Sequence, residues 1–202
     1  MSLSTYVKIG NVTNLSDARY CAGMGVDVIG FPIDGSGQQG LTSEKFLEIT
    51  EWISGIQLAG EFTDVSIEDI KLALQSYDLD IVEINQINIV ESVNLLGKPI
   101  FFRITLENEE DMAKLKSRLS YLDELVDSII IRSSNPSLYD EIDEFLRYYG
   151  GNLRILKGYG ISTDKVPDLD CFKGIELVAT EEERPGFKDY GQVMDVLEAL
   201  ES

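Results

Sequence analysis

Short apolar segments alternate with longer amphipathic segments along the whole chain, in a unit of roughly 25 residues that is typical of repeated strand–helix pairs. Segments such as Val26–Phe31 and Val126–Ile131 are nearly continuous in apolar residues, as strands buried on both faces of a parallel sheet must be. The segments that fit this description are Tyr6–Ile9, Val26–Phe31, Ile56–Phe62, Leu79–Ile84, Pro99–Thr105, Val126–Ile131, Leu153–Leu156 and Gly174–Val178.

The segments between these strands begin with residues that favour helix N-termini. Thr42, Ser66 and Asn108 each precede an acidic residue in the first turn and then an apolar face, which suits both the cap and the helix dipole. The segment Gln86–Leu95 has the weakest helical pattern, because its Ile, Val and Asn content fits irregular structure equally well.

This alternation in 202 residues predicts an α/β protein of one domain, residues 1–202, folded as a single (β/α)8 or TIM barrel. The alternative is an open, doubly wound parallel sheet, which the same local pattern could build. In a barrel the functional residues lie at the carboxyl ends of the strands, where the loops lead into the helices.

The chain is strongly acidic, with 36 acidic and 17 basic residues and a formal charge of −19. Such a surface repels phosphate backbones and anionic lipids, so we expect no nucleic acid and no membrane as partner. No apolar run approaches the roughly 20 residues of a membrane span, and Met1–Ser4 lacks the basic start of a signal peptide, so we expect a cytoplasmic protein.

The residue types present restrict the chemistry. The chain has no histidine, which removes the commonest general base near neutral pH and the commonest metal ligand. Cys21 and Cys171 have no metal-ligand spacing, and we expect both to be small buried residues. We therefore expect neither a metal nor a cofactor.

Two parts of the chain resemble phosphoribosylanthranilate isomerase, an enzyme family of tryptophan biosynthesis. Val7–Asn14, followed by Asp17-Ala18 and by Gly25–Phe31, is similar to the family's opening, which reads Lys-Ile-Cys-Gly-Ile-Thr-Asn. Gly174–Glu176 with Pro185–Asp189 is similar to its closing stretch. The resemblance implies a (β/α)8 barrel and an aldose–ketose isomerase, which rearranges a phosphorylated aminoaldose into an aminoketose.

The two catalytic positions that the resemblance implies are both altered. The family's general base is a Cys at the end of the first strand, where this chain has Gly10. Its general acid is an Asp at the end of the sixth strand, where this chain has Arg132. Glycine has no side chain to accept a proton, and a guanidinium does not give one up in a protein. We therefore expect the ordinary isomerisation to be impaired or altered.

The ligand-binding positions implied by the resemblance are partly altered as well. Gln39 stands where the family has a substrate-contacting Arg, Asn85 where it has a His, and Thr180 where a Gly lets backbone approach the phosphate. Glutamates after Thr180 would repel a phosphate by around 1–4 kcal/mol each at contact distance. The candidate ligand-binding residues are Lys8, Asp34, Gln39, Asn85, Arg103, Arg132, Gly158, Gly160, Ala179 and Thr180.

Strand alternation places Lys8 on the same face as Gly10, toward the barrel interior, together with Glu83, Arg132 and Glu176. One interpretation is a buried ion-pair network that fills the barrel mouth, since an unpaired buried charge is costly. The other is a remodelled site in which Lys8 and Arg132 hold an anionic ligand and Glu83 or Glu176 acts as a base.

Three functions remain open at this point. The first is an isomerase-like barrel that has lost the ordinary reaction and binds a related small phosphorylated ligand. The second is an active isomerase with relocated catalytic groups. The third is a non-catalytic binding or assembly protein. Loss of both acid and base removes two effects of roughly 10²–10⁴ in rate each, which favours the first. The sequence does not indicate an oligomeric state.

Overall fold

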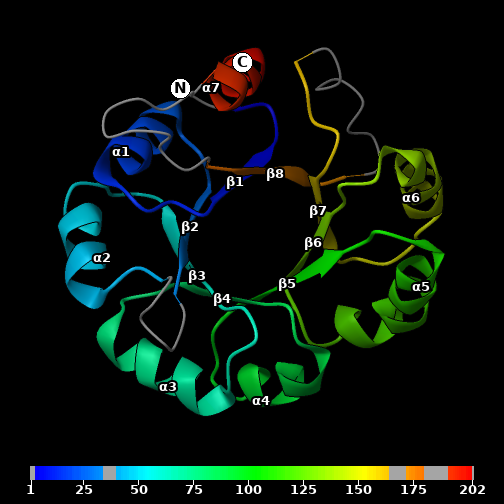
Figure 1. The fold of residues 1–202 in the computed structure, drawn as a ribbon, viewed down its shortest axis with the longest axis horizontal. Coiled ribbons are helices and arrows are strands. Elements are labelled where there is room, and N and C mark those ends of the chain that lie inside the picture. Colours follow the sequence, from blue (N-terminus) through cyan, green and yellow to red (C-terminus); the bar gives the residue numbers. More distant parts are fainter. Residues whose placement is uncertain (1–2, 34–39, 164–171, 180–190, 202) are drawn as a thin grey trace.

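The computed structural model describes residues 3–33, 40–163, 172–179 and 191–201, and its eight parallel strands close into one barrel (Figure 1). The predicted (β/α)8 barrel is confirmed, and the open-sheet alternative is wrong because β1 pairs with β8. The strands are β1 (Tyr6–Gly10), β2 (Val28–Pro32), β3 (Gln57–Glu61), β4 (Ile81–Ile84), β5 (Ile100–Thr105), β6 (Ser128–Arg132), β7 (Arg154–Gly158) and β8 (Gly174–Val178).

Helices surround the barrel on its outer side (Figure 1). Within the described ranges they are α1 (Leu15–Met24), α2 (Ser43–Thr50), α3 (Ile67–Ser76), α4 (Val90–Asn94), α5 (Glu109–Asp123), α6 (Tyr139–Arg147) and α7 (Gly191–Ala199), with 3₁₀ turns η1 (Ile87–Ile89) and η2 (Pro136–Leu138). The weakly helical Gln86–Leu95 thus divides into η1 and the short α4. A search of the described helices finds none that is both long and apolar enough to cross a membrane.

The helices begin where the capping residues predict. The side chains of Thr42, Ser66 and Asn108 each accept a hydrogen bond from a backbone N–H three residues on. At Ser66 the carboxylate of Asp69 also accepts from the backbone N–H of the cap, which completes a capping box. Such caps satisfy backbone donors that the first helical turn leaves without partners.

Three strands begin two residues later than predicted, each directly after an aspartate. Asp27, Asp80 and Asp127 precede β2, β4 and β6, and each carboxylate accepts a hydrogen bond from the backbone of the preceding neighbouring strand. The donors are the N–H groups of Val7, Leu58 and Ile100, at 2.7–2.8 Å. The apolar residue before each aspartate is buried although it does not belong to the strand. Its hydrophobicity therefore indicates burial and not the start of the strand.

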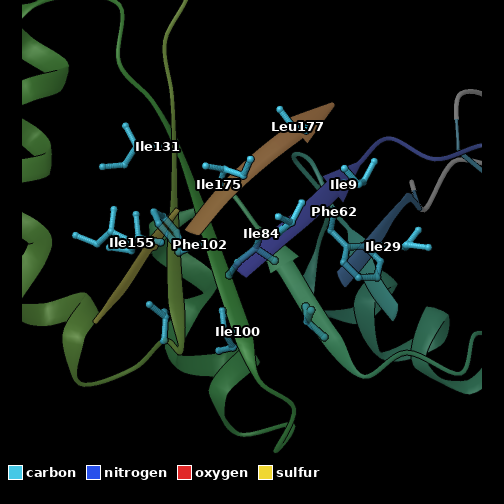
Figure 2. Packing of buried hydrophobic residues seen from close by; sticks show 14 of the residues in the cluster. Ile9, Ile29, Phe62, Ile84, Ile100, Phe102, Ile131, Ile155, Ile175 and Leu177 are labelled. Atoms are coloured by element: carbon cyan, nitrogen blue, oxygen red, sulfur yellow. The ribbon is translucent and has the colours of Figure 1, made fainter. Parts of the chain in front are cut away.

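The main core lies between the outer face of the barrel and the helices. Ile9, Ile29, Ile84, Phe102 and Ile131 are among its side chains and come from β1, β2, β4, β5 and β6 (Figure 2). Cys21 also lies in this core, 3% exposed, as predicted, whereas Cys171 lies outside the described residues. The outward-facing residues of the strands therefore hold the helices in place.

The barrel interior has two different layers. The lower layer is apolar and consists of Val28, Ala59, Ile81, Phe101, Ile130 and Leu156. Two residues further along several of these strands, at their carboxyl ends, the inward-facing residues are charged. The apolar layer thus forms the floor beneath a charged mouth.

Candidate functional site

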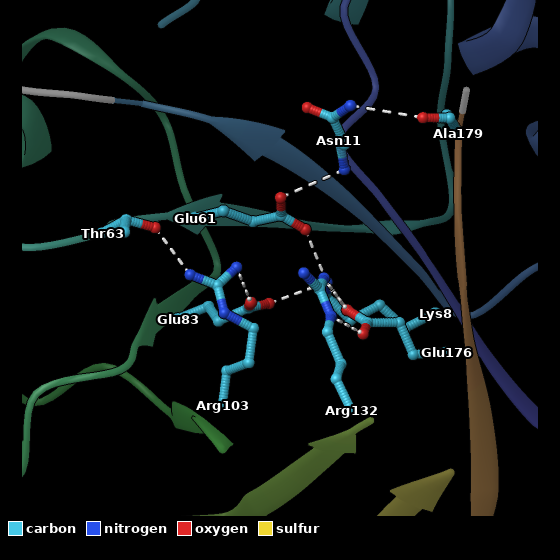
Figure 3. A network of polar contacts seen from close by, with 9 residues as sticks. All are labelled: Lys8, Asn11, Glu61, Thr63, Glu83, Arg103, Arg132, Glu176 and Ala179. Carbon is cyan, nitrogen blue, oxygen red and sulfur yellow. Dashed lines mark hydrogen bonds and ion pairs between the residues drawn. The ribbon is translucent and has the colours of Figure 1, made fainter. Parts of the chain in front are cut away.

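Six charged side chains fill the barrel mouth, and the strand register brings them together (Figure 3). The pairing of β1 with β8 sets Lys8 opposite Glu176, and the pairing of β3 with β4 sets Glu61 opposite Glu83. Arg103 on β5 and Arg132 on β6 complete the group, which we call the mouth network: Lys8, Glu61, Glu83, Arg103, Arg132 and Glu176.

Lys8 lies at the centre of the mouth network and is completely buried. Its Nζ atom lies 2.6 Å from Glu61 Oε1, 2.7 Å from Glu83 Oε2 and 2.6 Å from Glu176 Oε1. It donates hydrogen bonds to Glu61 and Glu176, whereas Glu83 Oε2 accepts none from the described residues. One carboxylate oxygen therefore has only the ion pair with Lys8.

The two arginines pair with two of the carboxylates. Arg132 Nε and Nη2 donate to Glu176 Oε2 and Oε1 at 2.5 and 2.8 Å, which is the bidentate geometry of strong arginine–carboxylate pairs. Arg103 Nη1 donates to Glu83 Oε1 at 3.1 Å, and its Nη2 donates to Thr63 Oγ1 at 2.6 Å. Three cations thus face three carboxylates, so the mouth network is neutral when Glu83 is ionised.

Glu83 and Glu176 differ in pKa because their charged partners differ. Burial raises the pKa of Glu83 to about 7, although Lys8 opposes the shift. Burial would also raise the pKa of Glu176, but the charge of Lys8 and the hydrogen bonds from Arg132 lower it to about 2. For Lys8 and Arg132 burial is likewise overcome by the facing carboxylates, and both pKa values are raised. Glu83 is therefore the carboxyl group of this pair that titrates near neutrality.

Glu61, Glu83 and Glu176 lie close enough to hold a metal ion, with one oxygen of each within 4.8 Å of the others. The ammonium group of Lys8 already lies within 2.7 Å of all three. A divalent ion there would meet the like charge of Lys8 at short range. The arrangement thus fits a tethered ammonium better than a metal.

Gly10, where the resemblance implies a catalytic Cys, has no room for a larger side chain. A Cβ atom on Gly10 would lie 2.7 Å from Glu61 Oε1, and one on Gly30 would overlap the same carboxylate. Glu61 Oε2 also accepts a hydrogen bond from the backbone N–H of Asn11 at 3.1 Å. The carboxylate of Glu61 therefore occupies the space that a side chain at position 10 would need.

The glycines at the carboxyl end of β7 have neighbouring groups where a side chain would lie. A Cβ atom on Gly158 would lie 3.1 Å from Arg132 Cγ and 3.2 Å from Glu176 Oε2. Gly160 adopts a left-handed backbone conformation (φ 58°) and packs against the ring of Tyr139, where a Cβ would lie 2.7 Å from the nearest ring carbon. The N–H of Ala179 donates to the backbone oxygen of Gly10 at 2.8 Å. A side chain therefore does not fit at Gly158 or Gly160, and the N–H of Ala179 already has a protein acceptor.

Beside the mouth, a cavity of about 550 Å³ lies against β5 and α5. Arg103 and Arg132 line it from the barrel, and Thr63 and Asn85 line it from the loops after β3 and β4. We call it the β5–α5 cavity; its full lining is Thr63, Asn85, Phe102, Arg103, Ile104, Thr105, Asp111, Lys114, Leu115, Arg118 and Arg132.

The structure brings most of the predicted site residues together. The mouth network contains Lys8, Glu83, Arg103, Arg132 and Glu176, while Asn85 lies at the adjoining cavity. The predicted residues Asp34, Gln39 and Thr180 lie outside the described residues.

Sequence reasoning missed the role of Glu61, and with it that of Thr63. The signal was present, because Glu61 has the inward parity of Ala59, and Gly10 and Gly30 leave space beside it. Only the pairing of β1, β2 and β3 shows that Gly10, Gly30 and Glu61 lie at one point.

Comparison with known proteins gives relatives by structure alone. No protein-family model matches the chain, and no curated protein matches it by sequence. Phosphoribosylanthranilate isomerase from Thermotoga maritima superposes with a TM-score of 0.77 at 19% identity, covering 97% of this chain and 98% of that one. A phosphoribosylanthranilate isomerase in complex with reduced 1-(o-carboxyphenylamino)-1-deoxyribulose 5-phosphate gives 0.73 at 20% identity, covering 97% and 98%.

The likeness extends to another barrel enzyme. 3-Hexulose-6-phosphate synthase from Salmonella typhimurium superposes with a TM-score of 0.64 at 15% identity, covering 96% of this chain and 98% of that one. At these identities the comparisons establish the fold alone. The protein has the (β/α)8 barrel of the phosphoribosylanthranilate isomerases and resembles them over nearly its whole length.

Proposed function

We propose that this barrel binds a small phosphorylated, sugar-like ligand at its mouth and is impaired in the aldose–ketose isomerisation of the enzymes that it resembles. The observation that carries the proposal is the position of Glu61, whose carboxylate fills the space beside Gly10. The same space would have to receive the side chain of a base at position 10. The mouth is thus organised around ion pairs rather than around that base.

The acid position supports the same conclusion. Arg132 donates two hydrogen bonds to Glu176, and its raised pKa keeps the guanidinium charged. A permanently charged donor can bind an anion or a hydroxyl group, but it cannot protonate a sugar ring oxygen as a carboxylic acid does. An acid and a base contribute about 10²–10⁴ in rate each, so loss of both leaves a slow reaction at best.

The polar groups near the mouth favour a ligand with hydroxyl groups and an anionic group. Arg103, Asn85 and Thr105 line the β5–α5 cavity together with further cations. The ligand in one of the structural relatives, a deoxyribulose 5-phosphate derivative, combines these features. A small anion is compatible with the chain's charge of −19, because local donors outweigh a screened distant field.

Calorimetry with reduced 1-(o-carboxyphenylamino)-1-deoxyribulose 5-phosphate tests the binding, and an isomerase assay tests the reaction. We expect measurable binding to the wild type, and turnover at least about 10⁴-fold below that of an isomerase with its acid and base intact. Absence of binding by this compound and by ribose 5-phosphate would contradict the binding proposal. Complementation of a tryptophan auxotroph that lacks the isomerase would contradict the proposed impairment.

A second candidate is an active isomerase with relocated catalytic groups, and two observations favour it. Glu61 places a carboxylate beside position 10, and the pKa of Glu83, raised to about 7, suits a general base near neutral pH. If the wild type turns over, Glu61→Gln and Glu83→Gln separate the two carboxylates. A loss of about 10²-fold or more in kcat with only one of them would identify the base.

A further inference from the structure

The β5–α5 cavity touches both faces of β5. Arg103 faces the barrel interior, whereas Phe102 and Ile104 face outward, and all three line the cavity. On α5 the lining residues Asp111, Lys114, Leu115 and Arg118 follow helical spacing, so they form one face of that helix. The cavity therefore connects the charged mouth with the inner face of α5.

Cations predominate in the lining, although the chain as a whole has twice as many acidic residues as basic ones. Arg103, Lys114, Arg118 and Arg132 face the cavity, and Asp111 is the single acid among its described lining residues. This concentration of positive charge is local, and at contact distance it outweighs the screened field of the distant acidic residues.

Arg118 differs from the other cations because it has no partner within the described part of the chain. Arg103 and Arg132 pair with Glu83 and Glu176 of the mouth network. Lys114 pairs with the 78%-exposed Glu110 at 2.9 Å. Arg118 is half-buried and makes no ion pair or hydrogen bond with the described residues. A partly desolvated guanidinium without an acceptor is a site for an external anion.

Hydrogen-bonding groups lie along the same cavity. Asn85 Oδ1 accepts a long hydrogen bond from the N–H of Asp64 at 3.4 Å, and the amide NH₂ group donates to none of the described residues. Thr105, at the end of β5, also lines the cavity and carries a hydroxyl group. These groups suit the hydroxyls of a polyol between the mouth and α5.

On the opposite side of the mouth, three of the described positions offer little room or donor capacity to an anion. The space beside Gly158 is filled by Arg132 and Glu176, Gly160 packs on Tyr139, and the N–H of Ala179 is bonded to Gly10. The resemblance implied a phosphate site on this side, after the last two strands. The described groups of this chain favour the β5–α5 side instead.

We propose that the β5–α5 cavity is an anion subsite in which Arg118 and Lys114 bind the phosphate of a phosphorylated polyol, while Asn85 and Thr105 bind its hydroxyls. This inference rests on the proposed function, which it deepens by placing the anionic end of the ligand. A guanidinium presents two parallel N–H groups to a phosphate, so Arg118 contributes geometry as well as charge.

Binding of ribose 5-phosphate to the wild type, Arg118→Gln and Arg118→Lys tests the subsite. We expect Arg118→Gln to raise the dissociation constant roughly tenfold, as loss of one charge-assisted hydrogen-bonding group does, and Arg118→Lys to raise it less. Arg147→Gln, on the exposed end of α6, is the matched control, since it changes the net charge equally; we expect a change of less than about twofold.

Amide NMR spectra with ribose 5-phosphate and with inorganic phosphate separate the two proposals. Shifts on α5 and at Asn85 that Arg118→Gln abolishes would support the subsite. Binding that Arg118→Gln leaves unchanged, or shifts confined to Gly158 and Gly160, would overturn the subsite while the proposed function stands. If inorganic phosphate shifts α5 in an Arg118-dependent way and ribose 5-phosphate binds no better, the subsite stands and the sugar-phosphate function fails. If neither probe binds, both are overturned.

Discussion

The two inner layers of the barrel are built on the same strands, two residues apart, and they have opposite chemistry. Ile81 and Phe101 pack in the apolar floor, whereas Glu83 and Arg103 follow them in the mouth network. Burial of apolar surface is nondirectional and tolerates small changes of shape. The mouth network instead depends on every charge having its partner, because a buried unpaired charge is costly.

Position along the strand, rather than the strand itself, separates stability from chemistry in this fold. The floor needs only side chains of suitable volume. In the mouth, Glu61 fills the space beside Gly10, so a change at either position has to keep the charges paired and the space filled. The stability cost of a substitution should therefore depend on pH in the mouth network and be independent of pH in the apolar floor.

Lys8→Met should give the greatest loss of stability. It leaves Glu61, Glu83 and Glu176 facing one another without the ammonium group between them. We expect a loss of about 3–5 kcal/mol in the free energy of unfolding at pH 8, measured in urea, as for other buried ion pairs that lose one partner. Lys71→Met, on the exposed face of α3, is the control and should change stability by less than about 0.5 kcal/mol. A loss no larger than the control's would show that the three carboxylates do not depend on Lys8 for their stability.

Glu83→Gln should change the pH dependence of stability. The pKa of Glu83 is about 7 in the folded protein against an ordinary value of 4.5. Between these pH values the folded state holds the proton more tightly, so the free energy of unfolding falls as pH rises from about 4.5 to 7. Glu176, whose pKa is lowered to about 2, acts in the opposite sense and only below 4.5.

The wild type should therefore lose roughly 1–3 kcal/mol between pH 4.5 and 8 relative to Glu83→Gln. Lys8, Arg103, Glu61 and Glu176 face Glu83 in both proteins, so the difference isolates this carboxyl group. Glu68→Gln, exposed on α3, serves as the control. Parallel pH profiles for wild type and Glu83→Gln would show that Glu83 keeps an ordinary pKa.

Ile130→Val in the floor should give the smallest effect. Removing one buried methylene is expected to cost about 0.5–1.5 kcal/mol. Because Ile130 packs among apolar side chains, the cost should be the same at pH 5 and pH 8. Urea unfolding at both values checks this; a pH-dependent cost would mean that floor and mouth are coupled.

Periodicity and capping residues predict the eight strands and most helix starts, whereas the preference for a closed barrel over an open sheet also depends on the resemblance. The strand boundaries were shifted where Val26, Leu79 and Val126 are buried by packing while the following aspartate binds the neighbouring strand. Hydrophobicity reports burial, and only backbone pairing defines the strand.

The charged residues of the mouth were predictable from strand parity, since Lys8, Glu83, Arg132 and Glu176 all face inward as expected. Their pairing was not predictable, because it depends on the register between strands far apart in sequence. Glu61 illustrates this point: its contact with the space beside Gly10 joins β3 to β1 across β2. The β5–α5 cavity likewise arises from side chains of several loops and one helix.

A double-mutant cycle between positions 10 and 61 tests whether Glu61 has taken the place of a side chain at position 10. Gly10→Cys should cost about 1–3 kcal/mol in the wild type, because the new side chain meets Glu61 Oε1. In the Glu61→Ala background, where that space is open, the same substitution should cost at least about 1 kcal/mol less, measured as free energies of unfolding in urea. An equal cost of Gly10→Cys in both backgrounds would show that the two positions are independent, and it would contradict the replacement of the catalytic position by the mouth network.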